Sequence, residues 1–337
     1  MTESSEEPQL GVTRRDVLKQ VGMGGAALGA GFVGGSLGAR PARADEGGYA
    51  VFGSEPTGPL AYGGASDPPA DLDATALDAL TNPPPRTSGP RRYEIDIVAR
   101  RAAVAASVTV EQWTFNGSAP GPILRATEGE QVSIRVRNLT DHHHNLHLHG
   151  RHSPLMDGWE PIPPGGEFTY EVTAGPAGIH PYHCHTAPLA QHVAKGLYGA
   201  FIVDPAEPRA GAREAVLLLS GWDTTGAGRN DIYTWNGVAG FFGKYPIKVH
   251  VGELVRLYVL NMTEYDPVGS FHLHAETFDV FRTGTGTLPS EHTDTVTLGQ
   301  GERAILEFRL PELGRYMFHP HQHHMASAGA MGWIAAI

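Results

Sequence analysis

One cysteine lies between two histidines in the segment His183-Cys184-His185, and the 337 residues contain 18 histidines but no second cysteine. Thiolate and imidazole are ligands that copper and zinc take from proteins. Alternate side chains of a β-strand point to opposite faces, so on a strand the two histidines share one face and the thiol lies on the other. The segment therefore predicts two metal-binding surfaces, one on each side of a strand.

The thiol side of this strand can form a closed site. His144 points away from the nearby histidines at 147 and 149, which lets it meet Cys184 inside the domain, and His192 follows Cys184 closely enough to add a second imidazole. One thiolate and two imidazoles in a trigonal array suit a blue copper centre. Leu197 takes the place where a weak axial methionine often lies. A residue that cannot coordinate there should raise the reduction potential, and the same place is compatible with ordinary core packing.

The other side of the strand carries histidines that the chain repeats. Segments 113–117, 129–138 and 147–149 return in the same order as 233–237, 252–261 and 272–274, and Tyr182-His183-Cys184-His185 returns as Phe318-His319-Pro320-His321. Such a series indicates a duplicated domain. Each copy then presents four outward imidazoles, which are His147, His149, His183 and His185 in the first and His272, His274, His319 and His321 in the second.

The second copy lacks the cysteine site. Gly269 stands where His144 is expected, Pro320 where Cys184 is expected, and Ala330 near the place of Leu197. The outward histidines are kept, however. Two patches of four imidazoles that face each other make a set of eight, which suits three copper ions better than one.

The elements that must position these residues read as strands. Residues 131–136 and 167–172 alternate polar and apolar side chains with period two, and turn clusters such as Pro163-Pro164-Gly165-Gly166 separate the runs. The high counts of glycine (43) and proline (26) suit short strands joined by turns, and no amphipathic helix stands out after the leader. We expect an all-β chain of two tandem cupredoxin-like Greek-key β-sandwich domains, at 91–207 and 208–337.

The N-terminal residues predict an export signal. Thr13-Arg14-Arg15-Asp16-Val17-Leu18-Lys19 resembles the twin-arginine motif, a Gly/Ala-rich run follows, and Ala42-Arg43-Ala44 is a small-residue cleavage site. The run is too short and too rich in glycine to span a bilayer well, so no stable membrane anchor is expected. We expect a signal peptide at 1–44, an irregular Pro- and Gly-rich extension at 45–90, and a periplasmic or secreted protein. The formal charge of −11 argues against nucleic acid as a partner.

With these motifs in place, residues 91–337 resemble the cupredoxin-repeat multicopper oxidases, in particular the two-domain laccase-like members that keep a blue copper in domain 1 only. The resemblance implies about four copper ions per chain: one type 1, one type 2 and a type 3 pair. It matches His144, Cys184 and His192 to the type 1 ligands and His147 and His272 to type 2. The type 3 pair is implied for His149, His183, His185, His274, His319 and His321.

The same resemblance implies a mechanism and an assembly. A reductant, by family default a phenol or an aromatic amine, gives single electrons to the type 1 site, and four electrons reduce O2 to water. Cys184 is joined by the backbone to His183 and His185, which connects the two kinds of site. Members of this group are homotrimers whose cluster lies between domain 1 of one subunit and domain 2 of its neighbour. The sequence leaves open whether the facing patch belongs to the same chain.

Asp157 matches an acidic position that the family places near the cluster, so it is the candidate proton relay. The alternative is an aspartate that forms the turn before Gly158. The remaining histidines have weaker patterns. We interpret His142, His143, His323 and His324 as solvated loop residues and leave His152, His180, His250 and His292 unassigned, with His292 a candidate partner of a ligand.

Other metals and functions fit the pattern less well. Zinc does not explain a cysteine between two histidines that only one copy has kept. A two-domain copper nitrite reductase shares the architecture but needs fewer histidines, and His147 occupies the place of its acidic residue. A periplasmic copper electron-transfer protein would need the cysteine site alone. The five methionines after the leader form no tract, which disfavours a cuprous oxidase, whereas manganese or a redox protein as the donor stays open.

Overall fold

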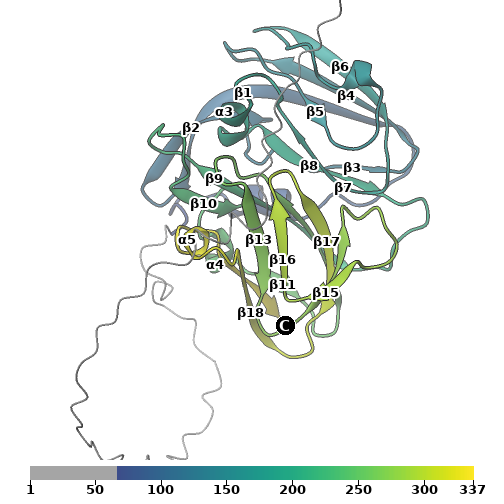
Figure 1. Ribbon diagram of the computed structural model, residues 1–337, viewed down its shortest axis with the longest axis vertical. Coiled ribbons are helices and arrows are strands. Elements are labelled where there is room, and N and C mark those ends of the chain that lie inside the picture. Colours follow the sequence, from purple (N-terminus) through teal and green to yellow (C-terminus); the bar gives the residue numbers. More distant parts are fainter. Residues whose placement is uncertain (1–66) are drawn as a thin grey trace, which may run out of the picture. The chain divides into compact units, whose positions relative to one another are not determined.

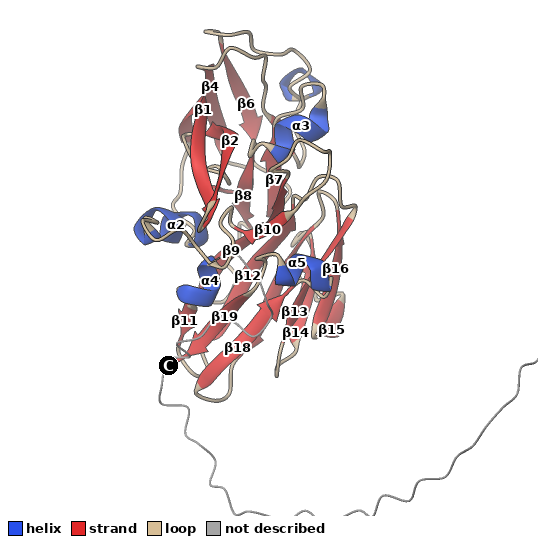
Figure 2. Cartoon of the chain, turned by 90° about the vertical axis from the view of Figure 1, so that its left-hand side faces the viewer, coloured by secondary structure: helices blue, strands red, loops and turns tan. Residues whose placement is uncertain are grey.

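The computed structural model describes residues 67–337, so the predicted signal peptide and the first part of the extension lie outside the described residues. The described chain is built mainly of strands with a few short helices (Figures 1 and 2). The predicted all-β architecture is therefore confirmed. No helix within the described part is long and apolar enough to cross a membrane.

The first domain is a sandwich of two four-stranded sheets with the strand orders β2-β1-β4-β6 and β3-β8-β7-β5. In β4 the residues Val132, Ile134 and Val136 are buried while their neighbours are not, as the period-two pattern predicts. A helix, α3 (Leu189–Ala194), and a 3-10 turn, η1 (Pro154–Met156), interrupt the strands. Its strands are β1 (Arg91–Ala105), β2 (Val108–Phe115), β3 (Leu124–Thr127), β4 (Gln131–Asn138), β5 (His147–Leu148), β6 (Glu167–Thr173), β7 (Gly178–His183) and β8 (Tyr198–Asp204).

The second domain is also a sandwich, of a six-stranded sheet (β10-β9-β12-β17-β14-β15) and a five-stranded sheet (β11-β19-β18-β13-β16). Two short helices accompany them, α4 (Phe241–Lys244) and α5 (His323–Ser327). The strands are β9 (Arg213–Trp222), β10 (Ile232–Trp235), β11 (Ile247–Val249), β12 (Leu254–Asn261), β13 (Val268–Leu273), β14 (Phe278–Arg282), β15 (Glu291–Thr293), β16 (Thr295–Gly299), β17 (Arg303–Arg309), β18 (Gly314–His319) and β19 (Gly332–Ala336).

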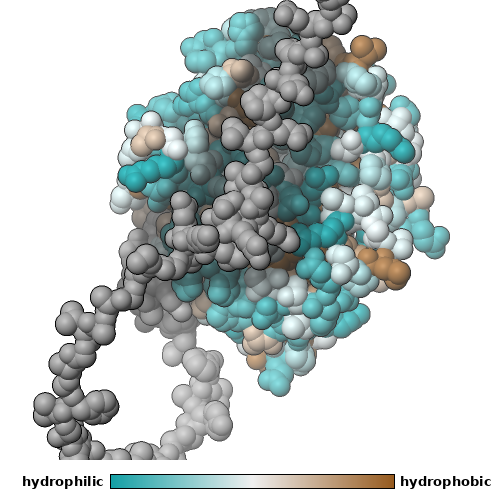
Figure 3. Space-filling model, in the orientation of Figure 1, coloured by the Kyte–Doolittle hydropathy of each residue, from teal (hydrophilic) through white to brown (hydrophobic). Residues whose placement is uncertain are grey.

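The two sandwiches share an apolar core of their own, in addition to the core inside each domain. Tyr198 and Ile202 of β8 pack in one cluster with Val216 of β9, Tyr258 of β12 and Ile305 of β17. Strands β9 and β12 are consequently buried on both sides, because one side faces the core of domain 2 and the other faces domain 1. On the outside, the face seen in Figure 3 is mainly hydrophilic, with single hydrophobic residues near its edges.

The prediction of an irregular extension is wrong for one segment. Residues Ala74–Thr81 form a helix, α2, whose N-cap Asp73 accepts hydrogen bonds from the backbone N–H groups of Thr75 and Ala76. Its residues Leu77 and Thr81 lie one turn apart and are buried, and Leu77 joins the core of domain 2. One helical turn on each side of Leu77 is too little for a periodic sequence signal, which explains the missed prediction.

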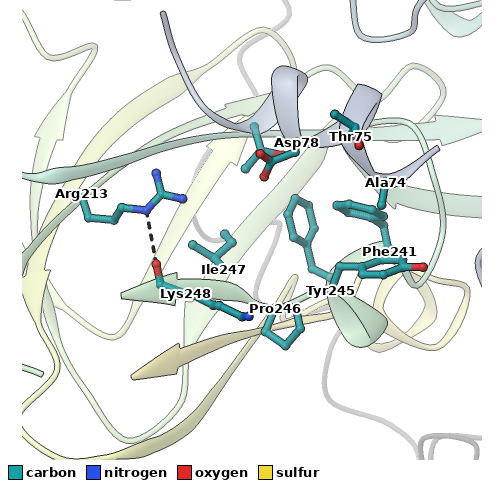
Figure 4. Close-up of a pocket in the computed structure, with 11 residues that line it drawn as sticks. Ala74, Thr75, Asp78, Arg213, Phe241, Tyr245, Pro246, Ile247 and Lys248 are labelled. Atoms are coloured by element: carbon teal, nitrogen blue, oxygen red, sulfur yellow. Dashed lines mark hydrogen bonds between the residues drawn. The ribbon is translucent and has the colours of Figure 1, made fainter. Parts of the chain in front are cut away.

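Helix α2 leaves a hollow of about 400 Å³ beside domain 2 (Figure 4). Ala74, Thr75 and Asp78 come from the helix, and Phe241 and Tyr245 from the α4 region form the opposite side. At one end, Nε of Arg213 donates to the backbone oxygen of Lys248 at 3.3 Å. The hollow holds none of the candidate metal ligands.

Candidate metal centres

The three predicted residues of the cysteine site converge from three segments of domain 1. Cys184 follows directly after β7, His192 lies in α3, and His144 precedes β5 in a segment held by a two-way backbone pairing with Ile162. Sγ of Cys184 lies 3.2 Å from Nδ1 of His192 and 3.8 Å from Nδ1 of His144, and the two Nδ1 atoms are 3.1 Å apart. The site is sealed from solvent, since the exposed fractions are 0% for His144 and Cys184 and 4% for His192.

This donor set fits a single metal ion. Bonds from sulfur and imidazole nitrogen to a metal are about 2.0–2.3 Å long, so atoms that share one ion lie within a few ångströms of one another. Burial lowers the pKa of His144 to about 3 and that of His192 to about 4, which keeps both imidazoles neutral and able to donate a lone pair. Burial raises the pKa of the Cys184 thiol, so a metal must displace its proton on binding.

Backbone and amide hydrogen bonds fix the site. The N–H of Cys184 donates to the oxygen of Leu197 at 3.0 Å, and the N–H of Leu197 donates to the oxygen of His192 at 3.3 Å. Leu197 is completely buried in the same apolar cluster as Cys184. Asn145 joins the two ligand segments, because its Oδ1 accepts from the N–H of His185 at 2.6 Å. Asn145 is a positioning residue that the sequence analysis missed.

The indole of Trp113 lies against the same site. Its ring centroid is 4.8 Å from that of His192 and 5.0 Å from that of His144. His142 covers it from another side, at 4.7 Å, so this histidine contacts Trp113 although it is exposed, as the sequence suggested. Trp113 is therefore the aromatic neighbour of both imidazoles of the cysteine site.

The four outward histidines of domain 1 form one patch. The ring of His147 lies 5.2–5.3 Å from those of His149, His183 and His185. Nδ1 of His147 lies 3.1 Å from the backbone oxygen of Asp157, and Nδ1 of His183 lies 2.9 Å from that of Cys184. A carbonyl can only accept, so both rings carry their proton on Nδ1 and turn a bare Nε2 outward.

The outward histidines of domain 2 repeat this arrangement. The ring of His272 lies 4.9–5.4 Å from those of His274, His319 and His321. Nδ1 of His272 lies 2.9 Å from the backbone oxygen of Asp294, and Nδ1 of His319 lies 2.8 Å from that of Pro320. Ser270 takes the part of Asn145, since its Oγ accepts from the N–H of His321 at 2.8 Å. The duplication therefore extends to the residues that hold the ligands.

A pair of Nε2 atoms in each patch lies close enough to share a metal ion. Nε2 of His149 is 3.2 Å from Nε2 of His183, and Nε2 of His274 is 3.0 Å from Nε2 of His319. At this distance one neutral ring can donate its Nε2–H to the other, or a metal ion can take a lone pair from both. Burial is the largest cause that lowers the pKa values of all four, to about 3 for His149 and about 4 for His183, which keeps the rings neutral and able to bind a metal. The patches thus fit metal ions.

The two patches do not meet within one chain. The domain 1 patch opens into a hollow of about 400 Å³ whose far side is formed by Met262, Glu264, Gln300 and Gly301 of domain 2, none of them a predicted ligand. The domain 2 patch opens into a separate hollow that Glu276, Thr277 and Asp294 complete. Among the described residues, no ring contact or hydrogen bond joins a histidine of one patch to a histidine of the other.

Asp157 lies beside the domain 1 patch. Its Oδ1 is 3.2 Å from Nδ1 of His147 and 3.6 Å from Nε2 of His152. His152, which the sequence left unassigned, is largely buried, and its Nε2 lies 2.8 Å from the backbone oxygen of Leu148. An aspartate between a buried imidazole and an outward ligand can hold a proton there. Nothing in the sequence spacing singled out His152.

The other histidines lie apart from the two patches or at their edges. His143, His323 and His324 are exposed, as expected, but His323 and His324 begin helix α5 and do not lie in a loop. The ring of His323 contacts that of His321 at 5.8 Å. His180 is buried and its Nε2 lies 2.8 Å from the oxygen of Pro176. His292 contacts Asp279 and Thr277 on the surface of β14 and β15 and no predicted ligand.

Domain 2 has filled the place of the cysteine site with core residues. The N–H of Ala330 donates to the oxygen of Met325, the same bond that joins Leu197 to His192 in domain 1. Met325 therefore stands where His192 does, and it is buried in the core of domain 2. Gly269 leaves no room either, because a Cβ there would come within 2.6 Å of Leu219. The sequence showed the lost ligands but not Met325.

Comparison with known proteins agrees with this geometry. Two family models, both described as multicopper oxidase, match residues 97–208 and 222–336. A solved structure described as a multicopper oxidase has a TM-score of 0.74 and 42% sequence identity, and the match covers 79% of this chain and 97% of that one. A copper nitrite reductase from Nitrosomonas europaea has a TM-score of 0.68 and 26% identity, over 73% of this chain and 93% of its own.

The curated relatives include both kinds of copper enzyme. A copper-containing nitrite reductase of Neisseria meningitidis is 27% identical over 72% of this chain and 68% of its own. The multicopper oxidase MmcO of Mycobacterium tuberculosis is 35% identical, but over only 36% of this chain and 24% of its own. The family models cover most of both sandwiches and all the candidate ligands described above. The chain is a member of the multicopper oxidase family, with two cupredoxin-like domains.

Proposed function

We propose that this protein couples the one-electron oxidation of a small reductant, with phenols or aromatic amines as the first choice, to the four-electron reduction of O2 to water. The family implies copper as the cofactor and O2 and a reductant as the substrates. The observation that carries the proposal is the pair of outward four-histidine patches in addition to the cysteine site. An electron carrier has no use for these eight further imidazoles.

Different residues are proposed to bind different copper ions. His144, Cys184 and His192 would hold a type 1 copper, and the two patches would hold one type 2 and two type 3 ions, about four per chain. Copper in these places supplies one-electron redox chemistry and the binding of O2. Cys184 connects the sites through its peptide bonds to His183 and His185, while the apolar cluster around Leu197 keeps water from the thiolate.

Proton delivery is proposed for Asp157. Its carboxylate touches His147 and lies next to His152, so it can take a proton at Oδ1 and release it beside the patch. The variant Asp157→Asn keeps the shape of the side chain but removes the carboxylate that could take up a proton. We expect a lower rate of O2 reduction with an unchanged rate of electron uptake at the cysteine site. Equal rates in the variant and the wild type would support the turn-forming role instead.

The cluster is proposed to form between copies of the chain, in a homotrimer in which domain 1 of one subunit faces domain 2 of the next. Its support is that each patch opens into its own hollow and meets no histidine of the other. A complementation experiment tests this. The variants His147→Ala and His272→Ala are each expected to be inactive. When both are co-expressed in equal amounts in a random trimer, about one interface in four combines two intact patches.

Recovery of activity in the co-expressed sample, with none after mixing of fully assembled single variants, supports clusters shared between chains. If the facing patch belonged to the same chain, no mixture would recover activity. The mass of the copper-loaded protein in solution gives the number of subunits.

Nitrite reduction is the second candidate, and a specific observation favours it: the nitrite reductases match this chain over 72% of its length, farther than the curated oxidases shown above. The number of histidines argues against it. His147 and the complete second patch exceed what a single type 2 copper needs. Copper content distinguishes the three candidate functions: about four ions per chain are expected for the oxidase, two for the reductase and one for an electron carrier.

The decisive test measures oxygen uptake by copper-loaded protein with a phenolic donor, beside the variant Cys184→Ser. We expect the wild type to consume O2 and to show a strong blue absorption, and the variant to lose both. Blue colour and full activity in the variant would disprove the role of Cys184. Nitrite reduction without oxygen uptake in the wild type would favour the reductase.

We also propose export by the twin-arginine route. This proposal rests on the sequence motif alone, since the motif lies outside the described residues. Changing Arg14 and Arg15 to lysine should leave the precursor in the cytoplasm, which fractionation of the cells measures. Export of that double variant at the normal level would contradict the assignment.

A further inference from the structure

The cysteine site is closed, so an electron donor must act through a neighbouring residue. His144 and Cys184 are completely buried, and only 4% of His192 is exposed. Trp113, with 8% exposed, lies against this site and also contacts Lys195, which lines a groove of about 660 Å³ on the surface. A groove of that volume is large enough for a small aromatic molecule.

The groove lies where three parts of the molecule meet. Gln191, Ala194 and Lys195 line it from α3 and its C-cap, the same helix that carries His192. Thr109 and Glu111 line it from β2, and domain 2 contributes the segment 223–228 after β9 and Tyr265. Figure 1 shows α3 and β2 near the ends of β9 and β10.

Trp113 connects the groove to the cysteine site through its contact with Lys195. Side chains two apart on a strand share a face, so Thr109, Glu111 and Trp113 form one row along β2. Nζ of Lys195 lies 4.9 Å from the centre of the indole, and the N–H of Trp113 donates to the oxygen of Lys195 at 3.0 Å. Since the indole also lies against His144 and His192, one aromatic ring contacts both Lys195 and the two candidate ligands.

Of the charged side chains that line the groove, Arg101 and Glu111 pair with each other, Asp223 is held by backbone N–H groups, and Lys195 has no acidic partner within the described part of the chain. Arg101 pairs with Glu111 at 3.0 Å. Asp223 accepts hydrogen bonds from the N–H groups of Thr225, Gly226, Ala227 and Gly228, which outweigh its burial and lower its pKa. Lys195 has no carboxylate within 4 Å among residues 67–337, and its contact there is the Trp113 ring. One ammonium group is thus available to a ligand.

Tyr265 gives the groove an aromatic wall. It is 39% exposed, and its φ of +66° lies in the left-handed region that a bulky residue rarely adopts. Its side chain lines the groove and is not buried in the core. An aromatic ligand can pack against this ring and place a negative group on Lys195.

We propose that this groove binds the electron donor and that it selects electron-rich aromatic molecules with one negative charge, such as phenols that carry a carboxylate. Lys195 binds the carboxylate and Tyr265 the ring. That the bound molecule is the electron donor rests on the proposed function, whereas binding in the groove can be measured without turnover.

Binding of a redox-inert analogue tests the groove without catalysis. Calorimetry on the copper-loaded full-length protein compares 4-methoxybenzoate with its neutral methyl ester. In Lys195→Gln we expect the Kd of the acid to rise about tenfold and the acid-to-ester preference to fall by the same factor, as for loss of a charged hydrogen bond. Tyr265→Ala should weaken both ligands about threefold to tenfold, since the ring contact is shared.

A matched control is available in Lys244, whose Nζ lies 5.4 Å over the ring of Tyr245, away from the groove. Lys244→Gln should leave both Kd values unchanged. The proposal is overturned if Lys195→Gln binds the acid as tightly as the wild type does, or if Lys244→Gln weakens it equally. Oxygen uptake with phenolic donors is measured separately: binding without uptake refutes the proposed function, whereas uptake without a Lys195 effect on binding refutes the groove.

Discussion

The two domains share one frame but differ in what they place inside it. In domain 1, Oδ1 of Asn138 accepts from the N–H and hydroxyl of Thr140, and in domain 2 Asn261 and Thr263 make the same two bonds. The outward histidines are held alike in both. The cysteine site, in contrast, exists in domain 1 alone. The histidine patch is therefore common to both domains. The cysteine site is not needed for the fold, because domain 2 forms the same sandwich without it.

Packing explains why a single change cannot restore the lost site. Beside Gly269, Leu219 and Asn261 occupy the space that an imidazole would need. Met325 fills the place of His192 with an apolar chain that contacts the core, and Pro320 supplies no ligand atom. Core packing in domain 2 therefore fills the place that the cysteine site occupies in domain 1.

Equivalent substitutions in the two domains should give the largest difference. His192→Leu removes a ligand of the cysteine site, so we expect loss of the blue absorption and a fall of more than about a hundredfold in donor oxidation. Met325→Leu changes the corresponding residue of domain 2 to one of similar volume, and should keep the colour and lose less than about 1.5 kcal/mol of stability. Absorption spectra, oxygen uptake and thermal unfolding measure the pair. Equal loss of colour in both variants would contradict the assignment of His192.

The next largest effect concerns the contact between the domains. Arg125 of β3 donates to Asp204 of domain 1 at 2.7 Å and to Glu214 of domain 2 at 2.8 Å, and all three are largely buried. Arg125→Met leaves the buried carboxylate of Asp204 without a cation and leaves Glu214 with Arg256 and Tyr258 alone, so we expect a loss of about 3–5 kcal/mol in the free energy of unfolding. Urea unfolding measures this loss. The exposed pair of Arg101 and Glu111 is the control, since Arg101→Met should cost no more than about 1 kcal/mol.

The same network should make the contact sensitive to acid. Burial alone would raise the pKa of Glu214, but hydrogen bonds from Arg125 and Tyr258, with the charges of Arg125 and Arg256, outweigh it and lower the pKa below 4.5. A carboxylate with a lowered pKa stabilises the fold above its unfolded value and loses that contribution as the pH falls through its folded value. Unfolding free energies between pH 6 and pH 3 should therefore fall more steeply for the wild type than for Glu214→Gln.

A smaller effect is expected from α2, which packs on domain 2 and not on the cysteine site. Leu77 is 7% exposed and contacts the core of domain 2, so Leu77→Ala should cost about 2–4 kcal/mol. Thermal unfolding of the copper-loaded protein measures the loss. The blue absorption of the folded variant should equal that of the wild type, and a weaker band would show that α2 also supports domain 1.

The sequence predicts well whatever depends on a regular period. The alternation in 131–136 and the duplicated histidine segments gave the strands, the two copies and the two sides on which the ligands lie. It predicts poorly what depends on contacts between distant segments. The bond from His185 to Asn145 spans 40 positions, and Met325 is equated with His192 only through its bond to Ala330, because the intervening loops differ in length.

Two further features show the same limit. His152 lies 3.6 Å from Asp157 and 2.8 Å from the backbone oxygen of Leu148 in β5, and nothing in the spacing between residues 147 and 157 predicts these contacts. Helix α2 is stabilised by the core of domain 2, to which Leu217 and Leu219 of β9 contribute about 140 positions farther along the chain, and not by its own weak periodicity. Long-range packing overrides local pattern in both cases.

The smallest effect separates two interpretations of Leu197. The residue is completely buried beside Cys184, which fits core packing and an axial place without coordination alike. Leu197→Met conserves the volume, so the fold should lose less than about 1.5 kcal/mol. If the position is axial, the thioether should bind the type 1 copper and lower its reduction potential by roughly 60–120 mV, or one to two tenfold steps in relative affinity for the two oxidation states. Redox titration of the blue band measures the shift. Leu197→Ile, which offers no sulfur, should keep the wild-type potential, and equal potentials in all three proteins would leave Leu197 a core residue only.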